Sequence, residues 1–499
     1  MRDTEMQRHL LSKSTFIRGL QCPRSLYLNR KHPDLRDATP PELQRVFDTG
    51  TEVGIRARDL FPGGIDAGPR GPRDHLESLG RTKKLIEEGA PVIYEAAFQH
   101  ERVLSIMDIL TRDASGWRAY EVKSSTSVTE TYIMDASLQY HVITGSGLPL
   151  EDISIVHLNN AYVRRGALDA SSLFTVQSVL SEARENRDLV RNEIEEMKQV
   201  LRGKSVPDVA IGEHCFSPYQ CDFFGYCWNN LPEDSVFDIA RLPKKKMFEL
   251  YSRGIVRFKD IPPDYPLTRG QRLQVESHLS GEGYLDRDGL ASFMAEIRYP
   301  LFFMDFETFM PAIPLYDESR PYQQIPFQYS LHYQAGPADE IRHFEYLAEA
   351  GNDPRREFIT RLLGDTAPPG DILVYHAAFE TSRLRELARD FPEFHDEIEK
   401  RIGRIRDLMV PFRKKIVYAP EMRGSYSIKA VLPALIPGTG YEGLAIADGG
   451  TAMAAFLDLQ GETDRETIAH TRRALKEYCR MDTLAMVKLW HHLENLRDS

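Results

Sequence analysis

The chain has 499 residues, which is too long for one ordinary domain core, so we expect two domains and a connector. Its hydrophobic content of 42% and aromatic content of 10% exclude a disordered protein. Its net charge of −11 excludes a protein that simply coats nucleic acid through a basic surface.

The sequence predicts a protein without a membrane partner. Its first nine residues form no apolar signal core, and no stretch is long and apolar enough to span a bilayer. We therefore expect a cytoplasmic protein. In that reducing compartment, the five cysteines are expected to be metal ligands or buried thiols rather than disulfides.

Residues 1–235 are predicted to form the first domain. A helical pattern covers about 14–28, strand patterns lie between 92 and 123, and a long charged helix is expected over about 176–201. Residues 236–298 contain short amphipathic patterns broken by prolines, which indicate a helical connector.

Residues 299–499 are predicted to form the last domain. Its strand patterns lie at 301–307, 327–333, 341–347 and 372–376. Helices are expected after Asp353-Pro354 and over 382–389. Three strands, a helix, a strand and a helix is the order of an RNase H-like domain. The expected fold class is therefore mixed α/β.

The segment 103–123 predicts a β-hairpin that carries the first candidate site. Its turn is expected to be the six residues Thr-Arg-Asp-Ala-Ser-Gly. If the hairpin pairs Leu110 with Trp117, Asp108 lies on the same face as Glu121. The sequence thus predicts two carboxylates at one place on the sheet.

Lys123 shares this face because it lies two residues after Glu121 on the same strand. Carboxylates of this kind hold Mg²⁺ or Mn²⁺ through hard oxygen ligands, and a lysine positions or deprotonates water. An ordinary exposed Glu-x-Lys pair on a strand is the alternative interpretation.

Four of the five cysteines bracket this hairpin, and they are Cys22, Cys215, Cys221 and Cys227. Four thiolates in one domain indicate an iron–sulfur cluster or a zinc ion, whereas four unrelated buried thiols are the alternative. A metal centre here would tie Cys22 to a segment about 190 residues later, where cross-linking removes much unfolded-chain entropy.

Asp305 and Glu307 form the core of the second candidate site. They lie two residues apart on an apolar strand, so both carboxylates share one face. Burying charge on such a strand costs free energy, which indicates a function for the two carboxylates. Near the C-terminus, Tyr478 and Asp482 lie four residues apart in a helical pattern and project together.

The first motif and the four cysteines resemble the RecB-like branch of the PD-(D/E)xK nucleases. The resemblance is to the CRISPR-associated RecB-like exonucleases and the iron–sulfur AddB-type nucleases, and it covers about the first half of the chain. It implies a restriction-endonuclease-like fold, a metal ion on Asp108 and Glu121, and catalytic roles for Lys123 and Gln139. It also implies a [4Fe–4S] cluster, with Zn²⁺ as the runner-up, on Cys22, Cys215, Cys221 and Cys227.

The chain departs from that pattern in two places. Many relatives carry a metal-binding histidine where this sequence has Gly54, so that ligand is missing or replaced by Glu52. The usual Cys-x2-Cys spacing is here Cys-x5-Cys, which weakens the iron–sulfur assignment.

The second motif resembles the DEDD exonucleases of the DnaQ-like superfamily, in the variant with Tyr-x3-Asp. This resemblance spans about the last two hundred residues. It implies two metal ions on Asp305, Glu307 and Asp482, with Tyr478 orienting the attacking water. Glu380 stands where the family has Asp, and Asp407 is the alternative partner.

The two resemblances together imply a prokaryotic fusion of two nuclease domains. We expect a Mg²⁺- or Mn²⁺-dependent enzyme that degrades DNA, as single strands or from an end, in repair or defence. A ribonuclease and a nucleic-acid-binding adaptor with inactive sites are the alternatives. The sequence has no phosphate-binding helicase loop, so unwinding would need a helicase or another repair or defence partner.

Overall fold

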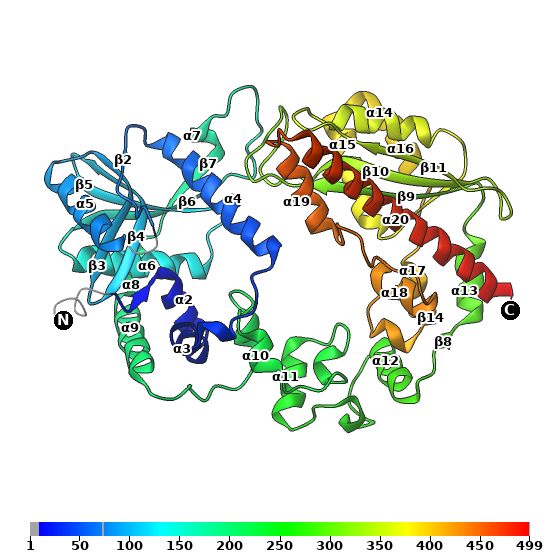
Figure 1. Ribbon diagram of the computed structural model, residues 1–499, viewed down its shortest axis with the longest axis horizontal. Helices are drawn as coiled ribbons and strands as arrows, with labels where there is room; N and C mark the ends of the chain where they lie inside the picture. Colours follow the sequence, from blue (N-terminus) through cyan, green and yellow to red (C-terminus); the bar gives the residue numbers. More distant parts are fainter. Residues whose placement is uncertain (1–8, 72–73, 499) are drawn as a thin grey trace. The chain divides into compact units, whose positions relative to one another are not determined.

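The computed structural model describes residues 9–71 and 74–498 (Figure 1). Its helices and mixed sheets confirm the predicted mixed α/β class. None of the described helices combines the length and the hydropathy that a membrane-spanning segment needs. The chain divides into two units, namely Met1–Asn230 with Ala312–Tyr322, and Leu231–Pro311 with Gln323–Ser499.

The first unit is built on a seven-stranded sheet in the order β2-β3-β4-β5-β6-β7, with β1 paired to β4. Neighbours β3, β4 and β5 are antiparallel, whereas β5 and β6 are parallel. The strands are β1 (Leu11–Ser12), β2 (Ile65–Asp66), β3 (Val92–His100), β4 (Val103–Asp113), β5 (Gly116–Lys123), β6 (Leu150–Leu158) and β7 (Phe174–Ser178).

Helices supply both hydrophobic cores of this unit. One core joins Phe16, Val142 and Ile194 to the sheet, and the other joins Val53 to it. The helices are α2 (Lys13–Gln21), α3 (Pro23–Lys31), α4 (Pro41–Ala57), α5 (His75–Glu87), α6 (Glu130–Gly145), α7 (Ala170–Leu173), α8 (Leu180–Glu185), α9 (Arg187–Arg202) and α10 (Phe224–Trp228).

Two predicted helices of this unit differ from the observed elements. The helix expected over 14–28 is broken at Cys22, because Pro23 lacks an N–H and begins a new helix instead. The helix expected from residue 176 begins later, because Val176 pairs with Val156 in the edge strand β7. The aromatic and β-branched residues Phe174, Thr175 and Val176 favour that strand over a helix.

The second unit begins with helices that lie within the predicted connector, residues 236–298. They surround a small core that includes Val236, Leu250 and Phe258. These helices are α11 (Lys244–Ser252), α12 (Arg269–Ser280) and α13 (Arg287–Ala295). The short strands β8 (Tyr284–Leu285) and β14 (Val417–Tyr418) pair in an antiparallel ribbon.

A five-stranded sheet in the order β11-β10-β9-β12-β13 forms the rest of this unit. Strands β9, β10 and β11 are antiparallel neighbours, and β12 lies parallel to β9 on the other side. The strands are β9 (Leu301–Phe309), β10 (Ile325–Gln334), β11 (Arg342–Leu347), β12 (Asp371–Val374) and β13 (Ile405–Asp407). The observed order of elements is the one expected for this region.

Helices cover both faces of this sheet (Figure 1). Phe303 is fully buried in the core that contains Trp490 of the long helix α20, whereas Phe306 contacts Phe358 of α14. The helices are α14 (Arg355–Asp365), α15 (Ala377–Asp390), α16 (His395–Ile402), α17 (Val410–Arg413), α18 (Ile428–Leu435), α19 (Gly449–Leu459) and α20 (Arg465–Asp498).

Replacing Phe303 with alanine is expected to lower the free energy of unfolding by about 3–5 kcal/mol, because a large void would open under β9. Phe344→Ala on β11 is the matched control, since its side chain is 37% exposed and its loss should cost about 1 kcal/mol or less. Urea unfolding of both full-length variants measures the difference. Equal losses would contradict the assignment of Phe303 to the core.

Candidate functional site

The two carboxylates of the first site, Asp108 and Glu121, lie on neighbouring strands. The strands pair Leu110 with Ala119, so the register differs by two residues from the predicted one. Because side chains repeat every two residues, the shift keeps both carboxylates on the same face. Asp108 Oδ2 also accepts a hydrogen bond of 2.6 Å from the backbone N–H of Val122.

The turn explains why the predicted register was wrong. Asp113 Oδ1 accepts hydrogen bonds from the backbone N–H groups of Ser115 at 2.7 Å and Gly116 at 3.2 Å. Gly116 has a φ of 137°, which favours glycine. The strands therefore run on to Asp113 and Gly116, and the six-residue loop that we expected is a tight turn.

Glu121 is buried at the centre of the first site. Its Oε1 accepts hydrogen bonds from Lys123 Nζ at 2.7 Å and from Lys13 Nζ at 2.6 Å. Its Oε2 accepts a hydrogen bond of 2.7 Å from Gln139 Nε2. Lys123 Nζ also lies 2.5 Å from Asp135 Oδ2.

Lys13 and Asp135 were not identified from the sequence. Asp135 lies four residues before Gln139 on α6, so helical spacing could have revealed it. Lys13 comes from α2, far away in the chain, and no local pattern connects it with Glu121. The site therefore contains two lysines where one was expected.

These charges set the protonation of the first site. Burial, with the nearby charge of Glu121, raises the pKa of Asp108 to about 8. Burial acts in the same direction on Glu121, but Lys123 and Lys13 outweigh it and hold the pKa of Glu121 below its ordinary value. Because Oε1 already accepts two hydrogen bonds and Oε2 accepts one, a divalent ion could coordinate Oε2 directly but could coordinate Oε1 only if a lysine moved away.

Glu95 on β3 adds a third carboxylate beside Asp108. Its backbone has a left-handed φ of 54°, and its charge contributes to the raised pKa of Asp108. Arg58 pairs with Glu95 at 3.2 Å. Among the described residues, Glu52 is exposed on α4, and neither a hydrogen bond nor an ion pair connects it with Asp108 or Glu121.

The second site brings Asp305 and Glu307 of β9 to Asp482 of α20. One carboxylate oxygen from each residue can be chosen so that all three lie within 4.8 Å of one another. Clustered oxygen ligands of this kind suit Mg²⁺ or Mn²⁺. The predicted metal ligands of this domain therefore lie together.

The carboxylates of the second site have little positive charge near them. Burial and the charge of Asp482 raise the pKa of Asp305, and the same two causes raise that of Glu307 to about 8. Burial also raises the pKa of Asp482, although Tyr441 and Lys429 act against it. A divalent cation would remove most of this repulsion.

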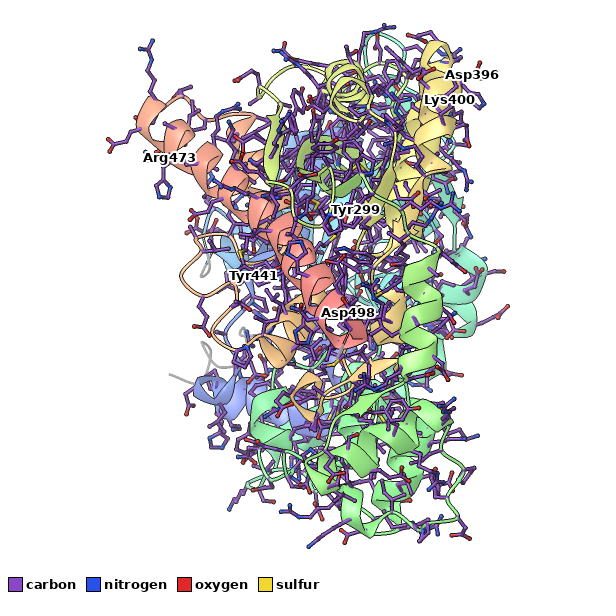
Figure 2. All side chains as sticks on the ribbon, turned by 90° about the vertical axis from the view of Figure 1, so that its right-hand side faces the viewer. Tyr299, Asp396, Lys400, Tyr441, Arg473 and Asp498 are labelled. Atoms are coloured by element: carbon purple, nitrogen blue, oxygen red, sulfur yellow. The ribbon has the colours of Figure 1, made fainter. Side chains whose placement is uncertain are left out.

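Tyr478 and Lys429 line the same cavity as the three carboxylates. Lys429 Nζ lies 3.2 Å from the phenol oxygen of Tyr478. Tyr441, which lies beside α20 in Figure 2, donates a hydrogen bond of 2.5 Å from its hydroxyl to Asp482 Oδ1. Tyr441 was missed because it lies in a loop, where no spacing relates it to Asp482.

Glu380 of α15 lines this cavity too, and burial raises its pKa to about 8. Its Oε2 is buried without a hydrogen-bond partner among the described residues. Asp407 instead accepts hydrogen bonds from the backbone N–H groups of His376 at 3.3 Å and Met409 at 3.0 Å. Glu380 is therefore the better fourth carboxylate, and Asp407 stabilises the end of β13.

A cavity in the first unit is lined by the four cysteines that the sequence singled out, together with His214 and aromatic side chains. Burial raises the pKa of the Cys22 thiol. Among the described residues, the four sulfurs do not form a group whose ligand atoms all lie within 4.8 Å of one another. The cysteines are Cys22, Cys215, Cys221 and Cys227.

Side chains of α2 bind the segment 214–222, which contributes two of the cysteines to the cavity. Arg18 forms a two-point ion pair with Asp222. Gln21 Nε2 donates hydrogen bonds of 2.7 Å to the carbonyl oxygens of His214 and Tyr219. The fifth cysteine, Cys479, lies elsewhere and packs in the core of the second unit.

Comparisons with known proteins give a family match for part of the second unit. Residues 302–427 match a family described as a domain of unknown function, DUF2779. An uncharacterised protein of Ureaplasma parvum serovar 3 is 26% identical over 230 residues, which cover 41% of this chain and 32% of that protein. An uncharacterised protein of Mycoplasma genitalium is 25% identical over 216 residues, covering 39% and 32%. The chain thus spans about a third of the length of these curated relatives.

The metal-free chain is expected to lose stability as the pH rises from about 5 to 9. A raised carboxyl pKa in the folded state contributes stability below the unfolded pKa of about 4.5. That contribution disappears as the pH rises through the folded pKa of Glu307, about 8. Thermal unfolding in chelator should show a falling Tm, and Mn²⁺ should restore it most at high pH because it binds the ionised carboxylates.

Glu307→Gln should flatten part of this pH dependence, because an amide does not ionise. Glu466→Gln is the matched control, since Glu466 is exposed on α20 and should leave the profile unchanged. A metal-free Tm that is constant or rises between pH 5 and 9 would contradict the prediction.

Proposed function

We propose that the protein is a nuclease that uses divalent metal ions, with its main active site at Asp305, Glu307 and Asp482. The observation that carries this proposal is the three-carboxylate group within 4.8 Å on β9 and α20. Mg²⁺ or Mn²⁺ bound there would supply Lewis acidity and a more acidic water. Glu380 lines the same cavity and could serve as a fourth ligand, since its buried Oε2 has no hydrogen-bond partner among the described residues.

The other residues of the cavity have defined parts in this reaction. Burial and the carboxylate charges raise the pKa of Tyr478 well above its ordinary value, so the phenol keeps its proton and can hold a water. Lys429 contacts that phenol and offers positive charge to a phosphodiester. Tyr441 fixes the orientation of Asp482 through its hydrogen bond.

The proposed substrate is DNA, presented as a single strand or at an end. Supporting this, a groove on the N-terminal half of α20 is lined mainly by basic side chains. Arg473 is exposed there and projects from the helix in Figure 2. Because Tyr478 and Asp482 lie further along α20, a phosphate backbone bound in the groove would continue toward the cavity.

Asp108, Glu121 and Lys123 are proposed as a second hydrolytic site, with Gln139 holding Glu121. If an ion bound through Oε1, Lys13 would have to leave Glu121, and its ammonium could then contact the phosphate. This site is therefore the weaker of the two as a metal site before substrate binds.

The cysteine cavity is proposed to hold a [4Fe–4S] cluster. Its donor set of four thiols suits either an iron–sulfur cluster or zinc. Sulfurs around one zinc ion would lie about 3.8 Å apart, given Zn–S bonds of about 2.3 Å. The four sulfurs do not all lie within 4.8 Å of one another, so they would have to move closer to bind a single zinc ion. Its part in the protein would be to join α2 and α3 to the segment 215–227.

Asp305→Asn is expected to reduce hydrolysis of labelled DNA in Mn²⁺ by about 100-fold or more, because a metal ligand is lost. Lys123→Ala should reduce only the share of activity that comes from the first site. Asp396→Asn and Lys83→Ala are matched exposed controls that should retain full activity. Single- and double-stranded DNA and RNA should be compared.

Each pattern of results has a distinct meaning. Activity on RNA alone would replace the DNA proposal with a ribonuclease, and binding without turnover would indicate an adaptor. Full activity in Asp305→Asn, with loss in Lys123→Ala, would move the chemistry to the first unit.

Cys221→Ala is expected to lower the iron content of anaerobically purified protein and to destabilise the first unit, because one of four ligands is missing. Cys479→Ala is the matched control, since this buried cysteine lies in the second unit, and it should leave iron unchanged. Iron, zinc and sulfide analysis of both variants measures the outcome. Wild-type protein with neither iron nor zinc would refute a metal centre here.

A further inference from the structure

A third cluster of metal-ligating side chains lies where the β3–β4 turn meets α6. His100 is the last residue of β3, Glu101 lies in the turn that follows it, and His141 comes from the helix. One ligand atom from each residue can be chosen so that all three lie within 4.8 Å of one another. By helical geometry, His141 projects from the side of α6 opposite to Gln139, so the cluster is separate from the first candidate active site.

The carboxylate of this cluster has its two oxygens in different surroundings. Glu101 Oε1 lies 3.7 Å from His100 Nε2. Glu101 Oε2 instead lies 3.7 Å from Lys198 Nζ, and Lys198 is itself paired with Glu195 at 2.7 Å. One oxygen is therefore held by an ammonium, while the other faces the imidazole.

The histidine on α6 has an unsatisfied nitrogen. His141 Nε2 is buried, and no described residue serves as its hydrogen-bond partner. A buried polar atom without a partner is costly in a folded protein. Burial also lowers the pKa of His141, so its ring is neutral at pH 7 and keeps a lone pair for a ligand.

A glycine allows the two histidines to approach each other. The imidazole of His100 occupies the space that a Cβ on Gly145 would fill, one helical turn after His141. The two rings lie 5.5 Å apart between their centroids. Any larger residue at position 145 would displace His100 from the cluster.

We propose that His100, Glu101 and His141 form a zinc-binding site. Two imidazoles and one carboxylate suit Zn²⁺, whereas Mg²⁺ prefers oxygen ligands alone. Ligand atoms around a tetrahedral zinc lie about 3.3 Å apart, so small side-chain movements would close the site. Water would fill the fourth position.

The bound ion would act as a clamp between the β3–β4 turn and α6. The opposite side of α6 carries Asp135 and Gln139, which contact Lys123 and Glu121. Holding α6 against the turn would therefore steady one wall of the first candidate active site. Zinc binding at the cluster does not depend on the nuclease proposal.

The test is a zinc count on the full-length chain, purified with its cysteine centre intact and then equilibrated with Zn²⁺ and desalted. Wild type should retain one more zinc per chain than His141→Ala, and Glu101→Gln should weaken binding by about 10-fold or more. The cysteines and the other carboxylates are the same in all variants, so their zinc cancels in the comparison. His395→Ala, which alters an exposed histidine on α16, should match wild type.

Gly145→Ala separates loss of the site from loss of folding. It removes no ligand, and alanine is a better helix former than glycine, so the fold should persist. It should nevertheless bind zinc about 10-fold or more weakly, because His100 is displaced. Added Zn²⁺ should raise the Tm of wild type and not that of this variant. Equal zinc contents and equal Tm shifts in wild type, His141→Ala and Gly145→Ala would overturn the proposal.

Discussion

Buried negative charge is the constraint on which the rest of this molecule depends. At an effective dielectric constant of about 20, two carboxylates 4.8 Å apart repel by roughly 3–4 kcal/mol. A folded domain is stable by only about 5–15 kcal/mol, so three such groups in one buried cluster need compensation. Asp305, Glu307 and Asp482 therefore have to share protons or bind cations.

The two units compensate their carboxylates in different ways. In the first, Lys13 and Lys123 both donate hydrogen bonds to Glu121, and their positive charges neutralise its carboxylate without a metal ion. In the second, Lys429 contacts the phenol of Tyr478, and the carboxylates keep raised pKa values. The uncompensated carboxylates of the second unit therefore favour binding of a divalent cation. The two lysines of the first unit instead favour an anionic partner, which could draw one of them away from Glu121.

The parts of the sites that follow from local periodicity could be predicted from the sequence. Glu121 and Lys123 share a face because strands repeat every two residues, and Tyr478 and Asp482 share a face because helices nearly repeat every four. Lys13 and Tyr441 could not be predicted, since only the tertiary fold brings them to Glu121 and Asp482. No sequence period encodes such contacts.

Each error in the predicted fold can be traced to the contacts of a single residue. The hairpin register depended on whether Asp113 ended a strand or lay in a loop, and its side-chain hydrogen bonds decide this. The prediction of a helix from residue 176 was wrong because Val176 pairs with Val156 in the sheet, and only the folded structure brings these two residues together. The order of elements in the second unit was easier to predict, because β9 and β10 are long buried strands and β12 lies between the helices α14 and α15.

The contacts between α2 and the segment around Asp222 constrain the order in which the first unit folds during synthesis. Arg18, Gln21 and Cys22 find their partners only after about 200 further residues have been synthesised. Contacts between such distant parts of a chain form slowly, because the intervening loop must close first. On the ribosome, α2 must therefore wait for the segment 214–222, and any cofactor held by the cysteines could be inserted only after residues 215–227 have been made.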